Sequence, residues 1–347
     1  MELPHTTSGF LSVVAAGLFQ GTMLTPMAYL RKWPWENIWF VYAIWAYLTL
    51  PWIFTAITVP YLPQVLAAAP ASGLARTLIF GVLWGVAVVL FGLGCEMLGI
   101  ALGFAIILGL GTSVGTLVPL ILQHRNQLFA PAGLGTIGGS ALLTIAVIML
   151  SIAGKKRDEV LKDSAPASEP AERQTGRGNF VLGLILCILC GLLNPLFNIA
   201  FAYGADIQAQ AMRFGAARAN AGNVVWLLVA NAGYFPSFIY CLLLLRKNRT
   251  WSYFGAGSPK YWFLTAAMGF MWISGTVLYG VGASLMGSLG PVIGWPVLMS
   301  TMVLTANFWG FLVGEWKGVH GFPRRLSITA VAILVIAMFT LGLTSRL

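Results

Sequence analysis

A single long stretch decides the fold class: residues 179–204 read NFVLGLILCILCGLLNPLFNIAFAYG and contain no charged side chain. A helix needs about 20 mostly apolar residues to cross the hydrocarbon core of a bilayer, which is roughly 30 Å thick. This stretch is long enough and apolar enough to do so. It therefore predicts a membrane-spanning helix.

Similar runs recur along the whole chain. We predict an all-α membrane protein with spans at residues 8–29, 37–59, 74–95, 99–122, 132–153, 179–204, 220–245, 261–283, 286–313 and 326–344. The composition agrees, because 58% of the 347 residues are hydrophobic and 9% are charged, whereas a soluble domain carries about 25% charged residues. The net charge of +10 could suggest a nucleic-acid ligand. However, Lys and Arg lie in the connections between spans, so we expect a lipid bilayer around the chain and no nucleic acid.

A charged segment from Lys155 to Arg177 divides the chain in the middle. Its Pro, Ala and Ser content is typical of a flexible linker without a core of its own. We therefore predict a first five-span unit at residues 1–153, a linker at 154–178 and a second five-span unit at 179–347.

The two units carry matching residues in the same order. Aligning the third span with the eighth pairs Trp84 with Trp272, and aligning the first span with the sixth pairs Gln20 with Asn194. Because each unit holds an odd number of spans, the units would be inserted with opposite orientations. This is the inverted-repeat plan of many transporters.

The placement of basic residues predicts the orientation. Most Lys and Arg residues lie in the first, fifth, seventh and ninth connections between spans. The positive-inside rule places these connections in the cytoplasm. We therefore expect a bacterial inner-membrane protein with a cytoplasmic linker and both termini in the periplasm.

Motifs for covalent chemistry are absent from the sequence. It has no G-x-x-x-x-G-K-[ST] phosphate loop, no H-E-x-x-H and no G-x-S-x-G, and no span carries paired carboxylates. Cys187 and Cys190 form a C-x-x-C pattern inside one span, where a thiol is usually a small packing residue rather than a metal or redox group. We expect no enzymatic activity, no metal and no other cofactor.

Several motifs resemble those of a known family. The segment Lys32-Trp33-Pro34-Trp35-Glu36 is the most specific, and residues 50–52, 80–85, 109–119 and 314–316 add to it in the same order. Together they resemble the L-rhamnose–proton symporter family of the drug/metabolite transporter superfamily. The resemblance implies ten helices in inverted repeats and uptake of L-rhamnose or a related neutral deoxysugar with a proton, by alternating access.

Two alternatives remain open from the sequence. One is a drug/metabolite-type exporter or a facilitator of another small polar metabolite. The other is a membrane component that transports nothing, such as a receptor or an assembly factor. A cation exporter would need a buried carboxylate near mid-span, and the predicted spans offer none.

Uncharged polar and aromatic residues are the candidates for a sugar site. An amide can both donate to and accept from sugar hydroxyls, and an aromatic ring offers a flat apolar face. Such residues also have structural roles, because amides link membrane helices and tryptophans favour the membrane interface. Asn194 is the best candidate, because the following Pro195 loosens the helix there. The predicted substrate-binding residues are Gln20, Trp84, Asn194, Asn198, Asn223, Trp272, Tyr279 and Trp295.

Carboxylates lie only near the predicted ends of spans. Glu96 follows the third span and Asp206 follows the sixth, so these two are the candidates for proton coupling. Glu36 and Glu315 flank the cytoplasmic helix ends, where carboxylates that face a loop or the interface are ordinary.

Overall fold

The computed structural model describes residues 3–163, 179–256 and 258–345. This part of the chain contains helices and turns without a β-strand, and ten of its helical segments are long and apolar enough to cross a membrane. The prediction of an all-α protein with ten spans is confirmed. Every backbone N–H and C=O group inside lipid needs a partner, and a helix supplies one within its own segment.

The spans follow one another along the chain with few additional elements. Those before the central charged segment are α1 (Leu3–Thr22) with η1 (Thr25–Tyr29), α2 (Trp35–Ala43) with η2 (Ile44–Thr49) and α3 (Leu50–Thr58), α5 (Ala71–Leu98), α6 (Ile100–Gln123) and α7 (Pro131–Asp163). Those after it are α8 (Phe180–Leu193) with α9 (Leu196–Tyr203), α11 (Asn223–Lys247), α13 (Pro259–Leu285), α14 (Gly290–Leu312) and α15 (Phe322–Thr344). Short helices in the connections are α4 (Leu62–Ala68), η3 (Arg125–Gln127), α10 (Ala205–Arg213) and α12 (Tyr253–Ala256).

Two spans are interrupted near their middle. The sixth breaks between α8 and α9, where Asn194 and Pro195 form a turn, as expected from the missing N–H of proline. The second widens into the π-helical η2. There the Asn231 side chain donates to the Tyr47 carbonyl at 2.9 Å and accepts from the Trp52 indole at 2.8 Å, so a neighbouring helix satisfies the irregular backbone.

The fifth span is longer than predicted. α7 continues to Asp163, so the expectation of a flexible linker from residue 155 is wrong for residues 155–163. Lys156 and Glu159 form an ion pair one turn apart at 2.8 Å. Arg157 also reaches Glu315 at 2.5 Å. These contacts support the helix beyond its apolar part, and the rest of the predicted linker lies outside the described residues.

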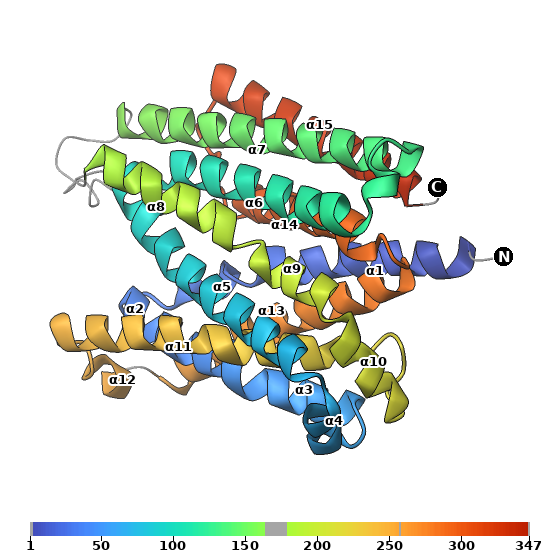
Figure 1. Cartoon of the computed structure of the whole chain (residues 1–347). Coiled ribbons are helices and arrows are strands. Elements are labelled where there is room, and N and C mark those ends of the chain that lie inside the picture. The colour runs from blue at the N-terminus through green and yellow to red at the C-terminus, as the bar shows by residue number, and fades with distance from the viewer. Residues whose placement is uncertain (1–2, 164–178, 257, 346–347) are drawn as a thin grey trace.

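The helices pack side by side (Figure 1). α7 runs along α15, and α6 lies between α7, α8 and α14. α5 contacts both α8 and α11, while α1 contacts α13 and α14. The most buried spans are α13 and α14, so their side chains form the centre of the molecule.

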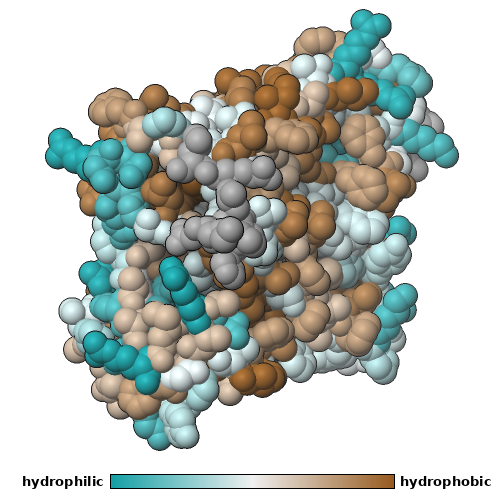
Figure 2. Space-filling view, turned by 90° about the vertical axis from the view of Figure 1, so that its right-hand side faces the viewer, coloured by the Kyte–Doolittle hydropathy of each residue, from teal (hydrophilic) through white to brown (hydrophobic). Residues whose placement is uncertain are grey.

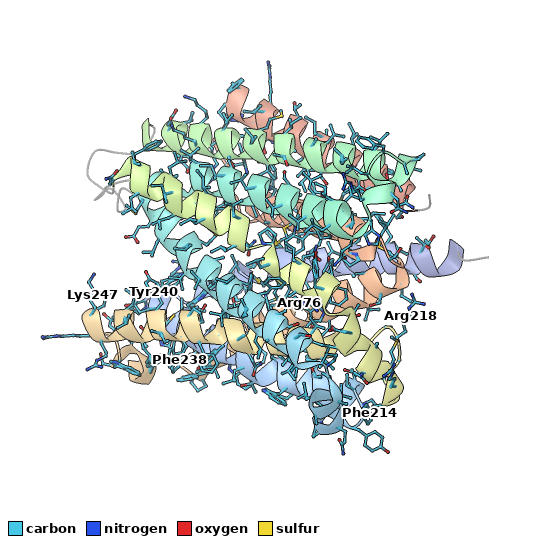
Figure 3. The ribbon with its side chains drawn as sticks, viewed as in Figure 1. Arg76, Phe214, Arg218, Phe238, Tyr240 and Lys247 are labelled. Atoms are coloured by element: carbon cyan, nitrogen blue, oxygen red, sulfur yellow. The ribbon has the colours of Figure 1, made fainter. Side chains whose placement is uncertain are left out.

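The two ends of the molecule differ in which elements they hold. α1 begins and α15 ends at one end, whereas α7 ends and α8 begins at the opposite end (Figure 1). Figure 3 places Phe214 and Arg218 at the first end and Tyr240 and Lys247 at the second. Seen from the first end, hydrophilic residues lie among hydrophobic ones (Figure 2). We call the first the terminal end and the second the linker end.

Candidate functional site

An aromatic cluster fills the centre of the helix bundle. The rings of Trp84 on α5 and Trp272 on α13 stack with centroids 5.8 Å apart. Phe197 on α9 lies 4.9 Å from Trp84, and Tyr47 in η2 lies 4.9 Å from Trp272. None of these four side chains is more than 6% exposed. The two tryptophans that the internal alignment pairs are therefore neighbours in space.

A buried amide lies one residue beyond Phe197. The Asn198 side chain donates to the carbonyl of Gly115 at 3.0 Å and to that of Pro291 at 3.1 Å. Its oxygen accepts a hydrogen bond from the Tyr279 hydroxyl. Both amide hydrogens and the amide oxygen are thus engaged, and Asn198 ties α6, α9, α13 and α14 together in this conformation.

The Trp295 side chain on α14 lies between α6 and Tyr279. Its indole N–H donates to the Gly111 carbonyl at 3.1 Å, and its ring lies 6.2 Å from that of Tyr279. A Cβ at Gly115 would overlap the indole ring. The glycine therefore allows the tryptophan to pack against α6.

Asn194 differs from the other predicted amides. It lies in the turn between α8 and α9 and is half-buried. Its Nδ2 is 3.8 Å from the position that a Cβ on Gly111 would occupy. Within the described residues its side chain makes no hydrogen bond. An unengaged amide at a helix break beside glycine is well suited to meet a polar ligand.

Gln20 and Asn223 lie on either side of this centre. Gln20 donates to the Thr276 hydroxyl at 3.3 Å, and Thr276 lies one turn after Trp272 and bonds to its carbonyl. Asn223 donates to the Thr58 hydroxyl at 2.9 Å. Gln20 therefore adjoins the aromatic cluster, whereas the Asn223 side chain holds the start of α11 against α3.

Further aromatic residues lie between the aromatic cluster and Tyr279, and the sequence analysis did not predict them. The Trp226 ring stacks on Phe197 at 4.6 Å and on Phe201 at 4.5 Å. It also lies 5.9 Å from Tyr279. Aromatic side chains are common in apolar spans, so nothing in the pattern distinguishes these from packing residues. A position near the middle of a span, as for Tyr47, is the signal that could have found one of them. Trp226 lies in the first turn of α11 and gives no such signal.

The two coupling candidates have different surroundings. Asp206 forms an ion pair with Arg76 at 3.4 Å, with 33% and 40% of the side chains exposed. Arg76 also donates to the Tyr203 carbonyl at 3.3 Å. Glu96 is exposed near the end of α5 and makes no ion pair within the described residues. The two carboxylates therefore do not share a site.

Comparison with known proteins identifies the family. Residues 8–345 match the family described as L-rhamnose-proton symport protein (RhaT). The chain is 25% identical over 348 residues to an L-rhamnose-proton symporter of Cronobacter sakazakii, with 97% of each protein covered. It is also 25% identical over 326 residues to one of Yersinia pestis, with 92% of each covered. The chain therefore belongs to the L-rhamnose-proton symport protein family, whose members are transporters and not enzymes.

Proposed function

We propose that this protein takes up L-rhamnose or a related neutral deoxysugar together with a proton, by alternating access in the bacterial inner membrane. The observation that carries the proposal is the family match over residues 8–345. Ten apolar helices and an uncharged aromatic centre agree with a neutral sugar as cargo. The same match argues against a receptor or an exporter.

The proposed sugar site lies at the break between α8 and α9. Asn194 would bond the sugar hydroxyls, and the faces of Trp84 and Trp272 would cover the ring. One hydrogen bond contributes a net ~0.5–1.5 kcal/mol, so micromolar binding near −8 kcal/mol needs several bonds and aromatic burial together. The remaining predicted residues are proposed as further contacts, formed as the buried rings part: Gln20, Asn198, Asn223, Tyr279 and Trp295.

We also propose that residues 1–153 and 179–347 are inverted repeats of the drug/metabolite transporter plan. The main helix contacts are kept when the two halves are exchanged, which supports this. α1 contacts α13 and α14, just as α8 contacts α5 and α6. Likewise α6 contacts α7 as α14 contacts α15, and α2 contacts α13 as α11 contacts α5.

Contacts between connections and helices add a second argument for the repeat. The backbone N–H of Lys32 donates to the Tyr261 hydroxyl at the start of α13, at 3.2 Å. At the start of α5, a Cβ added to Gly73 would overlap the Asp206 carboxylate, so these two residues are neighbours. In the internal alignment Lys32 corresponds to Asp206 and Tyr261 corresponds to Gly73. Corresponding contacts at opposite ends of the bundle are what an inverted repeat produces.

Uptake by the purified protein in liposomes tests the function. With a more acidic outside, we expect labelled L-rhamnose to accumulate above its outside concentration, and a protonophore to abolish the accumulation while exchange of internal for external sugar persists. D-glucose and an amino acid serve as controls for specificity. Liposomes with the Trp84→Leu variant should lose most uptake, because the ring face is removed. Equal uptake of all solutes, or uptake that ignores the pH gradient, would contradict the proposal.

A further inference from the structure

The carboxylate of Glu36 is buried, although the sequence suggested an ordinary loop-facing residue. It is 6% exposed and lies in the first turn of α2. Among the carboxylates whose exposure the structure describes, Glu36 alone is buried. It forms no ion pair with a basic residue in the described part of the chain. A buried charge is unfavourable unless hydrogen bonds replace its water, so its partners are informative.

Two neutral donors from the other half of the chain supply those hydrogen bonds. The Asn248 amide and the Thr250 hydroxyl donate to the same oxygen of Glu36 at 2.9 and 3.0 Å. Beside them, the Asn37 amide donates to the Thr250 carbonyl at 3.0 Å. The N-terminus of α2 adds a favourable electrostatic contribution for a negative charge. The start of α2 is thereby fastened to the turn that follows α11.

Aromatic packing adds to these hydrogen bonds between the two halves of the chain. Trp33 packs edge-on against Phe254, Tyr261 and Trp262, with ring centroids 5.3–5.5 Å apart. We use the name inner dock for the residues that make these contacts, namely Trp33, Glu36, Asn37, Asn248, Thr250, Phe254, Tyr261 and Trp262. It lies at the linker end, where α11 ends near Lys247 (Figure 3). The positive-inside prediction places this end in the cytoplasm.

Two polar groups of the inner dock lack a hydrogen-bond partner among the described residues. The Trp33 indole N–H and the Asn37 side-chain oxygen are buried without a hydrogen-bond partner. Such groups cost free energy when buried, and they would regain water if the dock opened. Because its partners are neutral, the Glu36 carboxylate would also exchange them for water without leaving an unpaired cation. Opening of the dock would therefore give these groups access to water.

At the terminal end, an ion pair takes the place of the neutral hydrogen bonds of the inner dock. There Asp206 and Arg76 join α10 to α5 through an ion pair, and the Arg76 Nε is again buried without a partner. We call this pair the outer dock. Both docks are closed in the structure, and the aromatic centre between them is buried.

We propose that Glu36 is a positioning residue of the transport cycle, which holds the inner dock closed while the sugar site faces outward. The inference rests on the alternating access proposed above. Release of Glu36 from Asn248 and Thr250 opens the path to the cytoplasm. In a two-state cycle, opening of the inner dock shifts the population towards conformations with the outer dock closed.

Hydrogen–deuterium exchange of the purified full-length protein tests this directly. In Glu36→Ala, we expect amides of residues 33–39 and 248–254 to exchange about tenfold faster, as expected for lost hydrogen bonds to a charged group. Amides near Arg76 and Asp206 should exchange more slowly, because the outer dock is closed for more of the time. A merely structural role would not produce this opposite response.

Matched variants keep the test decisive. Glu36→Gln retains an acceptor oxygen and should lie between the parent and Glu36→Ala. Thr250→Val removes one donor with little change of shape and replaces Glu36→Ala if that variant does not fold. Ser252→Ala changes an exposed side chain in the same turn and should behave like the parent.

Three outcomes would overturn an assignment. Exchange in Glu36→Ala and Thr250→Val equal to that in Ser252→Ala would remove the role of Glu36. Faster exchange at both docks would indicate general loosening and would also overturn the gating role. If the exchange pattern appears but the parent accumulates no L-rhamnose with a proton gradient, the proposed function fails while the inner dock stands.

Discussion

At the scale of single residues, Asn194 and Asn198 show that two residues in the same sequence pattern can have different surroundings in the folded protein. Asn194 and Asn198 are both Asn in an apolar stretch and are one turn apart. The Asn198 side chain forms hydrogen bonds with Gly115, Pro291 and Tyr279. Asn194 has no such partner among the described residues, which is why we propose that its amide binds substrate.

This difference predicts opposite phenotypes. Asn194→Ala should weaken L-rhamnose binding about 2- to 13-fold, corresponding to ~0.5–1.5 kcal/mol for one hydrogen bond, with a stability change within about 0.5 kcal/mol. Asn198→Ala should destabilise the fold by ~1–3 kcal/mol, because it leaves a buried hydroxyl and carbonyls unpaired. Binding by calorimetry and unfolding in the same detergent measure both. Unchanged binding in Asn194→Ala would remove this residue from the site.

At the scale of elements, an ion pair joins α10 to α5 and contains one of the two candidates for proton coupling. Asp206 contacts Arg76 at 3.4 Å in a partly exposed position, and such pairs contribute only ~0–1 kcal/mol to stability. A proton on Asp206 would release Arg76 and loosen α10 from α5. Glu96 makes no ion pair within the described residues, so we propose Asp206 as the coupling residue.

The prediction concerns Asp206→Asn. We expect this variant to keep exchange of internal for external L-rhamnose but to lose most accumulation driven by a pH gradient, since the side chain no longer takes up a proton. Glu96→Gln is the parallel variant and should retain gradient-driven accumulation. Liposome uptake with and without the gradient distinguishes them. The reverse result would transfer the coupling role to Glu96.

At the scale of the whole molecule, the distribution of basic residues predicts which end faces which side of the membrane. Basic residues cluster at the linker end, where Arg31, Lys32, Arg246 and Lys247 lie next to spans. The terminal end holds few. The positive-inside rule therefore predicts that the linker end faces the cytoplasm, and that the start of α1 and the end of α15 face the periplasm.

Labelling from one side of the membrane checks this orientation. Asn126 and Ser252 are exposed in connections at opposite ends, and the four native cysteines are buried. In spheroplasts, an impermeant maleimide should label the Asn126→Cys variant at once and the Ser252→Cys variant only after the membrane is permeabilised. The parent should remain unlabelled. Inverted labelling would reverse the orientation, and with it the names of both docks.

The sequence alone determined the number and type of spans, the break before Pro195 and the family. These features are local: a backbone in lipid must form helices, a proline loosens its own helix, and motifs are read in order along the chain. It also paired Trp84 with Trp272 through the internal alignment. It misjudged residues 155–163, because side-chain ion pairs continue α7 beyond its apolar run.

Only the tertiary structure decided which polar groups are engaged. Asn248 reaches Glu36 and Tyr279 reaches Asn198 across long separations in sequence. The environment of a carboxylate or an amide depends on such distant partners, and periodicity carries no information about them. For that reason the buried Glu36, the free Asn194 and the aromatic centre around Trp226 became visible only in the folded chain.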